Sequence, residues 1–257
     1  MVLTESSVAG WLTTAFPDIS SNLIAAAIGG ALVWAVTRVV RRVKLFRARR
    51  FWRAMGSRQP FIVLGAPDAE ALRRWEKTGM VGKGDILALV EVESQLRRLG
   101  FTGRIIEAKE LPPHDLMSDL VLIGGPDGNT VTKTMLKALG DRISYGFGEA
   151  RPDQATPLRD NRAGEEFSPA PDPDTGDPVE DYGLIVRSAN PLAPGSAEIV
   201  ILAGCWGYGT AAAAEMLDES KLLRRWPRSG KFEAVVKTSV VQGVYCKTEV
   251  QDVRAIS

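Results

Sequence analysis

An uncharged stretch followed at once by a strongly basic one constrains this chain most. Residues 19–37, ISSNLIAAAIGGALVWAVT, carry no charge, and residues 38–53 carry eight Lys or Arg and no acid. A helix needs about 20 mostly apolar residues to cross a bilayer, and positive charge is retained on the cytoplasmic side. The pattern predicts a single-pass cell-membrane protein. We expect a short extracytoplasmic segment (1–18), a transmembrane and basic juxtamembrane helix (19–58) and a cytoplasmic domain (59–257).

Other interpretations of this stretch are a signal peptide and a helix that does not span. A signal peptide carries its positive charge before the apolar run, whereas here Glu5 and Asp18 precede it. An interfacial or buried helix stays open, because Asn22, Gly29 and Gly30 dilute the apolar run. In a spanning helix, the two glycines would let a second copy approach closely. We therefore expect a homo-oligomer in contact with membrane lipid.

Charge and composition limit the partners of the globular part. Residues 59–257 hold 23 basic and 29 acidic residues, a net charge of −6, so a nucleic-acid surface is not expected. The basic stretch before them is better explained by topology and lipid headgroups. Cys205 and Cys246 are expected to be reduced thiols. With one histidine, His114, a His-ligated zinc site is not expected. We predict no metal, no cofactor and no nucleic-acid partner.

Apolar runs alternate with helical patterns after Pro60, which should end the long N-terminal helix. Such alternation is typical of an α/β fold, here a Rossmann-like, mainly parallel sheet with a C-terminal β-hairpin at its edge. The predicted strands are 61–65, 104–108, 119–123, 143–148, 181–187 and 198–203, with a hairpin over 232–256. The predicted helices are 84–99, 129–139 and 211–219. Residues 149–180 are proline- and acid-rich without periodicity, and we interpret them as an exposed loop.

Two segments share one pattern, a buried strand followed by a Gly-rich turn and a helix. They are DLVLIGGPDGNTVTKTML and EIVILAGCWGYGTAAAAEML. In a parallel sheet such turns lie at the carboxyl ends of strands, where ligands bind, and a helix N-terminus favours anions. The pair predicts a nucleotide-type cleft, although glycines also serve tight turns without any ligand. The candidate ligand-binding residues are Gly124, Gly125, Pro126, Asp127, Asn129, Thr130, Gly204, Cys205, Trp206, Gly207, Tyr208, Gly209 and Thr210.

Each polar or aromatic candidate has a structural alternative. Asn129 and Thr130 can cap the following helix instead of contacting a ligand, and capping is the favoured interpretation. Trp206 and Tyr208 can stack on a base or merely cover the turn. Cys205, beside a helix N-terminus, can have a lowered pKa.

No catalytic residue is assigned from the sequence. Asp85, Glu91 and Glu215 are the acids that an enzyme acting on a nucleoside would use. For Asp85 and Glu91, helix capping and surface charge are the stronger interpretations.

The run Gly207-Tyr208-Gly209-Thr210, followed by a helix that bears an acid, resembles the GG-x-GT-x-x-E signature of LOG-type Rossmannoid proteins. That group includes nucleotide-processing enzymes and sensor domains of bacterial conflict systems. The resemblance covers about ten residues, and Ala213 stands where the family has its Glu; the first acid is Glu215. If hydrolysis in the family depends on that Glu, the resemblance implies binding without cleavage.

The order of a membrane span and a Rossmann-like domain is similar to membrane effectors of bacterial antiphage signalling. The resulting hypothesis is a sensor-effector that binds a nucleotide-type signal and oligomerises to perturb the membrane. Two alternatives remain. One is a membrane-tethered enzyme that cleaves a nucleoside or nucleotide. The other is a non-catalytic scaffold that recruits a partner through residues 149–180.

Overall fold

The computed structural model describes residues 6–65, 80–149, 155–217, 222, 225, 227 and 230–256. Within residues 6–56, it describes the side chains of 26–40, 43, 46 and 48–56. The helices are α1 (Ser6–Gly56), α2 (Lys83–Arg98), α3 (Thr130–Leu139) and α4 (Gly207–Met216), with 3₁₀ turns η2 (Pro113–Met117) and η3 (Gly140–Arg142). The strands are β1 (Phe61–Leu64), β2 (Arg104–Glu107), β3 (Leu120–Ile123), β4 (Tyr145–Phe147), β5 (Leu158–Asp160), β6 (Glu166–Phe167), β7 (Ala170–Pro171), β8 (Pro178–Ala189), β9 (Glu198–Gly204), β10 (Phe232–Val241) and β11 (Val244–Ala255).

The main sheet confirms the α/β prediction but is less parallel than expected. Its strand order is β11-β10-β8-β9-β3-β1-β2, and β7 pairs with β8. The pairs β1–β2, β1–β3 and β3–β9 are parallel, whereas β8 pairs antiparallel with both β9 and β10. Only residues 190–197 join β8 to β9. That connection is too short for the crossover that parallel neighbours require, so β8 turns back beside β9.

The predicted C-terminal hairpin is present at the edge of this sheet. β10 pairs antiparallel with β11, and the turn falls at Gln242 and Gly243, both of which have positive φ. The remaining strands predicted from apolar runs are also present, with bounds that differ by a few residues.

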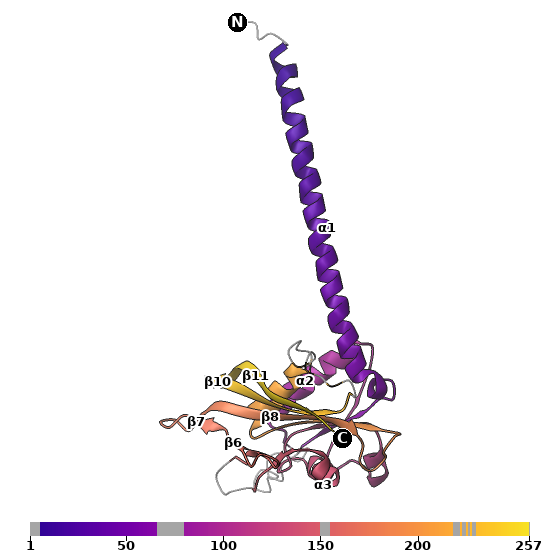
Figure 1. Ribbon diagram of the computed structural model, residues 1–257, viewed down its shortest axis with the longest axis vertical. Helices are drawn as coiled ribbons and strands as arrows, with labels where there is room; N and C mark the ends of the chain where they lie inside the picture. Colours follow the sequence, from indigo (N-terminus) through magenta and orange to yellow (C-terminus); the bar gives the residue numbers. More distant parts are fainter. Residues whose placement is uncertain are drawn as a thin grey trace. The chain divides into compact units, whose positions relative to one another are not determined.

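The sheet separates two cores, with α2 on one face and α3 on the other (Figure 1). On the α3 face, alternate strand residues such as Val63, Leu122 and Ile201 pack with Met135 and Leu139. The intervening residues, such as Ile62 and Leu202, are fully buried on the opposite face. There α4 packs against β8, β9 and α2. This alternation follows from the two-residue period of a strand.

Helix α1 runs without interruption from Ser6 to Gly56, so the segment expected before residue 19 continues into it. Among the residues whose side chains are described, no helix is long and apolar enough to cross a membrane. Residues 19–25 of the predicted span lie outside those described side chains.

The chain divides into two compact units, 1–46 and 47–257. The second unit thus includes the end of α1, which we expected to belong to the membrane segment. Phe51, Trp52 and Met55 are fully buried there. Trp52 Nε1 donates to Gln95 Oε1 of α2 at 3.2 Å. The Phe51 ring lies 6.3 Å from that of Phe232 on β10. These aromatic side chains belong to the protein core and not to a lipid interface.

Two partly buried ion pairs lie near this helix end. Arg58 donates from Nε and from its terminal nitrogen to Asp119, a nearly buried carboxylate that also accepts from the Glu198 backbone N–H at 2.7 Å. Arg187 donates to Glu198 at 2.5 Å and stacks over the Phe51 ring. The end of α1 is therefore tied to the beginnings of β3 and β9.

Part of the predicted loop over 149–180 is ordered as short strands. β4, β5 and β6 form a small antiparallel sheet, and β7 adds to the start of β8. Asp160 receives the backbone N–H groups of Arg162 and Ala163 and an ion pair from Arg254. β5, β6 and β7 have two or three residues each and leave no periodic signal, which is why the sequence did not predict them.

The buried end of α1 predicts a large difference between two tryptophan substitutions. Trp52→Ala should lower the free energy of unfolding by about 3–5 kcal/mol, because it empties a fully buried site and removes the N–H that Gln95 Oε1 accepts. Trp34→Ala, at a side chain that is 62% exposed, should change it by less than about 0.5 kcal/mol. Chemical denaturation of the full chain in detergent measures both. Equal effects would contradict the packing described here.

Candidate functional site

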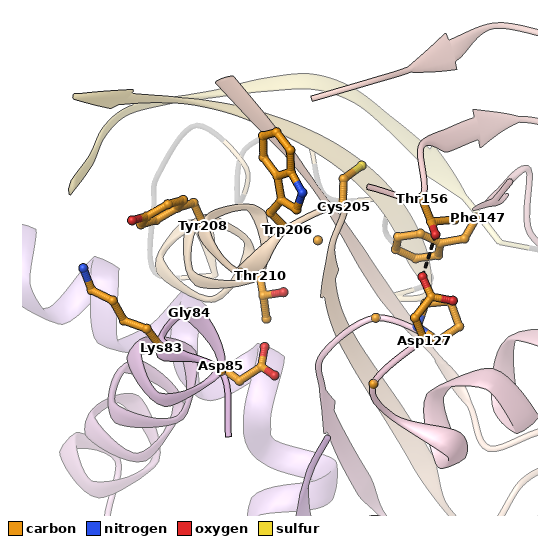
Figure 2. A pocket seen from close by; sticks show the side chains of 16 residues that line it. Lys83, Gly84, Asp85, Asp127, Phe147, Thr156, Cys205, Trp206, Tyr208 and Thr210 are labelled. Atoms are coloured by element: carbon orange, nitrogen blue, oxygen red, sulfur yellow. Dashed lines mark hydrogen bonds between the residues drawn. The ribbon is translucent and has the colours of Figure 1, made fainter. Parts of the chain in front are cut away.

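The two Gly-rich turns meet at one cavity of about 370 Å³, which we call the turn cavity. It lies where β3 and β9 end and where α2 begins, at the carboxyl edge of the parallel strands (Figure 2). Its lining residues are Gly82, Lys83, Gly84, Asp85, Gly125, Pro126, Asp127, Gly128, Phe147, Thr156, Gly204, Cys205, Trp206, Gly207, Tyr208 and Thr210.

Most of the predicted ligand-binding residues line this cavity, and four do not. Gly125, Pro126 and Asp127 line it from the first turn, and Gly204–Tyr208 and Thr210 from the second. The four that lie outside the lining are Gly124, Asn129, Thr130 and Gly209.

Asn129 has the structural role that we favoured. Its Oδ1 accepts from the N–H groups of Val131 and Thr132 and so caps α3. Its Nδ2 donates to the carbonyl oxygens of Val63 and Ile123 at 3.1 and 3.0 Å. The side chain is fully buried and joins the ends of β1 and β3. Thr130, the first residue of α3, is exposed.

Helix α4 begins at Gly207, earlier than the predicted start at residue 211, because a distant carboxylate supplies its cap. Asp181 on β8 is fully buried. Its two oxygens accept from the N–H of Trp206 at 3.1 Å and of Gly209 at 2.5 Å. Burial raises the pKa of this carboxyl to about 6, and the bonds from Gly209, Trp206 and Tyr182 oppose that rise. An internal anion therefore already occupies the N-terminus of α4.

Glycine allows α2 and α4 to touch beside the cavity. A Cβ atom on Gly84 would lie 2.0 Å from the Gly207 carbonyl oxygen, so no side chain fits there. Gly124 has φ +105°, and its Cα faces Asp85. The close approach of the two helices gives Gly207 of the second turn a structural role, and Gly207 also lines the cavity.

Asp85 is the acid on the α2 side of the turn cavity (Figure 2). The N-cap of α2 is Gly82, with no side-chain cap, so the capping role favoured for Asp85 is wrong. Among the described residues, no hydrogen bond or ion pair engages its carboxylate, and burial alone raises its pKa to about 6. Perturbed carboxyls in clefts are typical of functional sites.

Cys205 is not the reactive thiol that its position suggested. Burial, followed by the charge of Asp181, raises its pKa to about 12. The thiol therefore stays protonated at neutral pH. Its Sγ donates to the Phe167 carbonyl oxygen at 3.6 Å.

The basic and aromatic groups on the α2 side contact the hairpin. Lys83 Nζ donates to the Gly243 carbonyl oxygen at 3.1 Å and lies 5.7 Å from the centre of the Tyr208 ring. The Tyr208 hydroxyl donates to the same carbonyl at 3.0 Å. Figure 2 shows the Lys83 ammonium turned away from Asp85 and Thr210. On the opposite side of the cavity, the Thr156 hydroxyl donates to Asp127 at 2.5 Å.

The other two candidate acids lie away from the turn cavity. Glu91 accepts from Gln95 at 2.9 Å further along α2, and Glu215 is exposed on α4. Neither is part of the lining.

A second cavity, of about 700 Å³, adjoins the first; we call it the α3 cavity. The two share Pro126, Asp127 and Phe147. Lys133 of α3 and Arg162 bring positive charge to the α3 cavity, and Asp127 and Asp141 bring negative charge. Both basic residues are exposed.

Comparison with known proteins gives no family for this chain. No protein-family model matches it, and no curated protein matches it. Over the ranges that the structure describes, no three His, Cys, Asp or Glu side chains are grouped so that they could hold a metal ion.

Several residues of the site escaped the sequence analysis. Asp181 stands at the start of an apolar run, and nothing in the sequence connects it to the turn 25 residues later. Phe147 and Thr156 border a proline-rich stretch that we interpreted as a loop. Lys83 lies just before the predicted helix, and apart from its charge nothing in the sequence marked it as a residue of the site.

The buried charge of Asp85 predicts a stabilising substitution. Between about pH 4 and pH 6 the unfolded chain releases this proton while the folded chain keeps it, so the free energy of unfolding falls as pH rises. Asp85→Asn removes that cost and should raise the free energy of unfolding by about 1–3 kcal/mol at pH 7.5, with little effect at pH 4.

Glu93→Gln, on the same helix, is the matched control and should change stability by less than about 0.5 kcal/mol. Denaturant titrations at the two pH values measure the effect. Destabilisation by Asp85→Asn at pH 7.5 would contradict the assignment and favour a helix-end charge effect.

Proposed function

We propose that this protein is a membrane-anchored sensor-effector whose globular unit binds a nucleotide-type ligand in the turn cavity. One observation carries the proposal. The turn cavity lies at the carboxyl edge of the parallel strands, and among the described residues its acid, Asp85, has no partner. Its wall also contains three aromatic side chains, those of Phe147, Trp206 and Tyr208. Ligands of α/β sheets bind at this edge, and aromatic rings can stack on a base.

The contacts of α2 support a path from ligand to effector. Its first turn, with Asp85, borders the cavity. Three turns later, Gln95 accepts from Trp52 of α1 and donates to the Ala214 carbonyl oxygen of α4 at 3.1 Å. A ligand that shifts the start of α2 would therefore act on the end of α1 through a buried polar contact.

The effector half of the proposal rests on the sequence. We propose that α1 anchors the protein in the cell membrane, with its basic end and the globular unit in the cytoplasm, and that ligand binding promotes homo-oligomers that perturb the bilayer. The resemblance to LOG-type Rossmannoid domains on membrane anchors suggests a role in bacterial antiphage defence. Where that family has its Glu, this chain has Ala213, which supplies no carboxylate, and this favours binding over cleavage.

Ligand binding predicts thermal stabilisation by members of a nucleotide panel. At about 100 times its dissociation constant, a ligand adds roughly 2.7 kcal/mol to the free energy of unfolding. We expect at least one mono-, di- or cyclic nucleotide or NAD derivative to raise the melting temperature of the full chain in detergent.

A variant of the cavity wall tests whether the shift comes from this site. Gly128→Leu should abolish it, because residue 128 lines the turn cavity and a Cβ there meets no atom within 4 Å. Thr134→Leu, exposed on α3 outside the lining, should retain it. A panel without any shift would refute the proposal and favour the scaffold hypothesis.

A second candidate function, cleavage of a nucleoside or nucleotide, is favoured by Asp85 itself. A carboxyl with pKa about 6 can supply a proton to a leaving group near neutral pH. Chromatography of the panel after incubation with the protein would detect a free base or sugar. Product that disappears with Asp85→Asn, while binding persists, would identify an enzyme.

A further inference from the structure

The charges around the turn cavity constrain which part of a nucleotide it can hold. Given the proposed function, the nucleoside and phosphate moieties of the ligand can be assigned to different cavities from the hydrogen-bonding groups that are already engaged and those that line open space.

Side chains of the protein already engage two backbone N–H groups at the start of α3 and two at the start of α4. Asp181 takes the N–H groups of Trp206 and Gly209 at the start of α4. Asn129 takes those of Val131 and Thr132 at the start of α3. A phosphate that used these N–H groups would have to displace a buried side chain of the protein itself.

The start of α2 is the remaining helix end at the cavity, and it is unsuited to an anion. It has no side-chain cap, but the Asp85 carboxylate lies in its first turn. Gly207 also lies against Gly84, with its ideal Cβ position 3.2 Å from the Gly84 nitrogen. At neutral pH a phosphate there would meet an ionised carboxylate in a partly desolvated site, where like charges repel strongly.

The lining of the turn cavity instead suits a group that donates hydrogen bonds. Asp85 offers acceptor oxygens on one side, and Asp127 with Thr156 lies on the other (Figure 2). The one lysine in the lining, Lys83, donates to Gly243. Sugar hydroxyls and base amino groups are donors, whereas an ionised phosphate has only acceptors to offer.

Positive charge faces the neighbouring α3 cavity. Lys133 and Arg162 line it, and among the described residues neither side chain forms an ion pair or side-chain hydrogen bond. Asp141 and Asp127 also line this cavity and offset part of that charge; Asp127 stands at the border with the turn cavity, where it accepts from Thr156. Because Pro126, Asp127 and Phe147 belong to both cavities, one ligand can extend from the first into the second.

We propose that the turn cavity holds the nucleoside moiety of a nucleotide, with its hydroxyl or amino donors bonded to Asp85 and Asp127, and that its phosphates lie in the α3 cavity against Lys133 and Arg162. This arrangement reverses the expectation that the Gly-rich turns hold phosphate.

Isothermal titration of the full chain in detergent with the four ribonucleosides and their 5′-triphosphates tests this arrangement. At least one nucleoside should bind, and its triphosphate should bind more tightly. Loss of a bond to a charged group costs roughly tenfold to a hundredfold in affinity. Asp85→Asn should therefore weaken the nucleoside and the triphosphate by similar factors of about ten or more.

The basic residues should act on the phosphates alone. Lys133→Ala and Arg162→Ala should each weaken the triphosphate several-fold and leave the nucleoside unchanged. Lys137→Ala, exposed one helical turn along α3 and outside both linings, is the matched control and should change neither. Circular dichroism of each variant verifies that it is folded.

Two outcomes would overturn the assignment in distinguishable ways. If triphosphates bind but no nucleoside binds or competes with them, the turn cavity does not hold the nucleoside moiety; the proposed function then survives and this inference fails. Equal weakening of nucleoside and triphosphate by Lys133→Ala would also refute it. If neither nucleosides nor nucleotides bind, the proposed function fails, and the inference fails with it.

Discussion

The buried carboxylate of Asp181 is the interaction on which the site depends. It stands on β8 and accepts the N–H groups of Trp206 and Gly209, so that α4 begins at Gly207. That early start brings Gly207 against Gly84, so that α2 and α4 touch where both line the turn cavity. An ionised carboxylate without solvent is costly, and three backbone donors offset part of that cost. The cavity is consequently shaped by an internal anion that also excludes other anions from this helix end.

The two carboxyls with raised pKa have different environments and therefore different roles. Asp181 is fully buried and engaged by backbone donors. Asp85 is partly buried, lines a cavity and has no partner among the described residues. A buried carboxylate with a purely structural role is expected to have hydrogen-bond partners within the fold. A carboxylate without such partners at a cavity wall lowers the free energy of unfolding. Proteins retain such a cost where a ligand or a reaction uses the group.

The sequence predicted elements better than it predicted contacts. Runs such as LVLI and EIVILA have enough apolar residues to identify β3 and β9, and the glycines after them located the cavity edge. The sequence could not reveal that Asp181 caps α4, because that contact joins residues far apart in the chain. It also assigned residues 19–58 to a membrane and juxtamembrane helix, and nothing in the sequence indicated that Phe51 and Trp52 are buried in the globular unit. Only tertiary packing shows them inside the core.

The central claim is that a nucleotide binds between the start of α2 and the turn before α4. Hydrogen–deuterium exchange of the full chain, with and without the nucleotide that stabilises it most, tests that location directly. The account predicts slower exchange in residues 82–86, 125–128 and 204–210, with smaller changes near Trp52 and Gln95 at the end of α1. Protection confined to β2, to the β10–β11 hairpin or to residues 26–46 would contradict it.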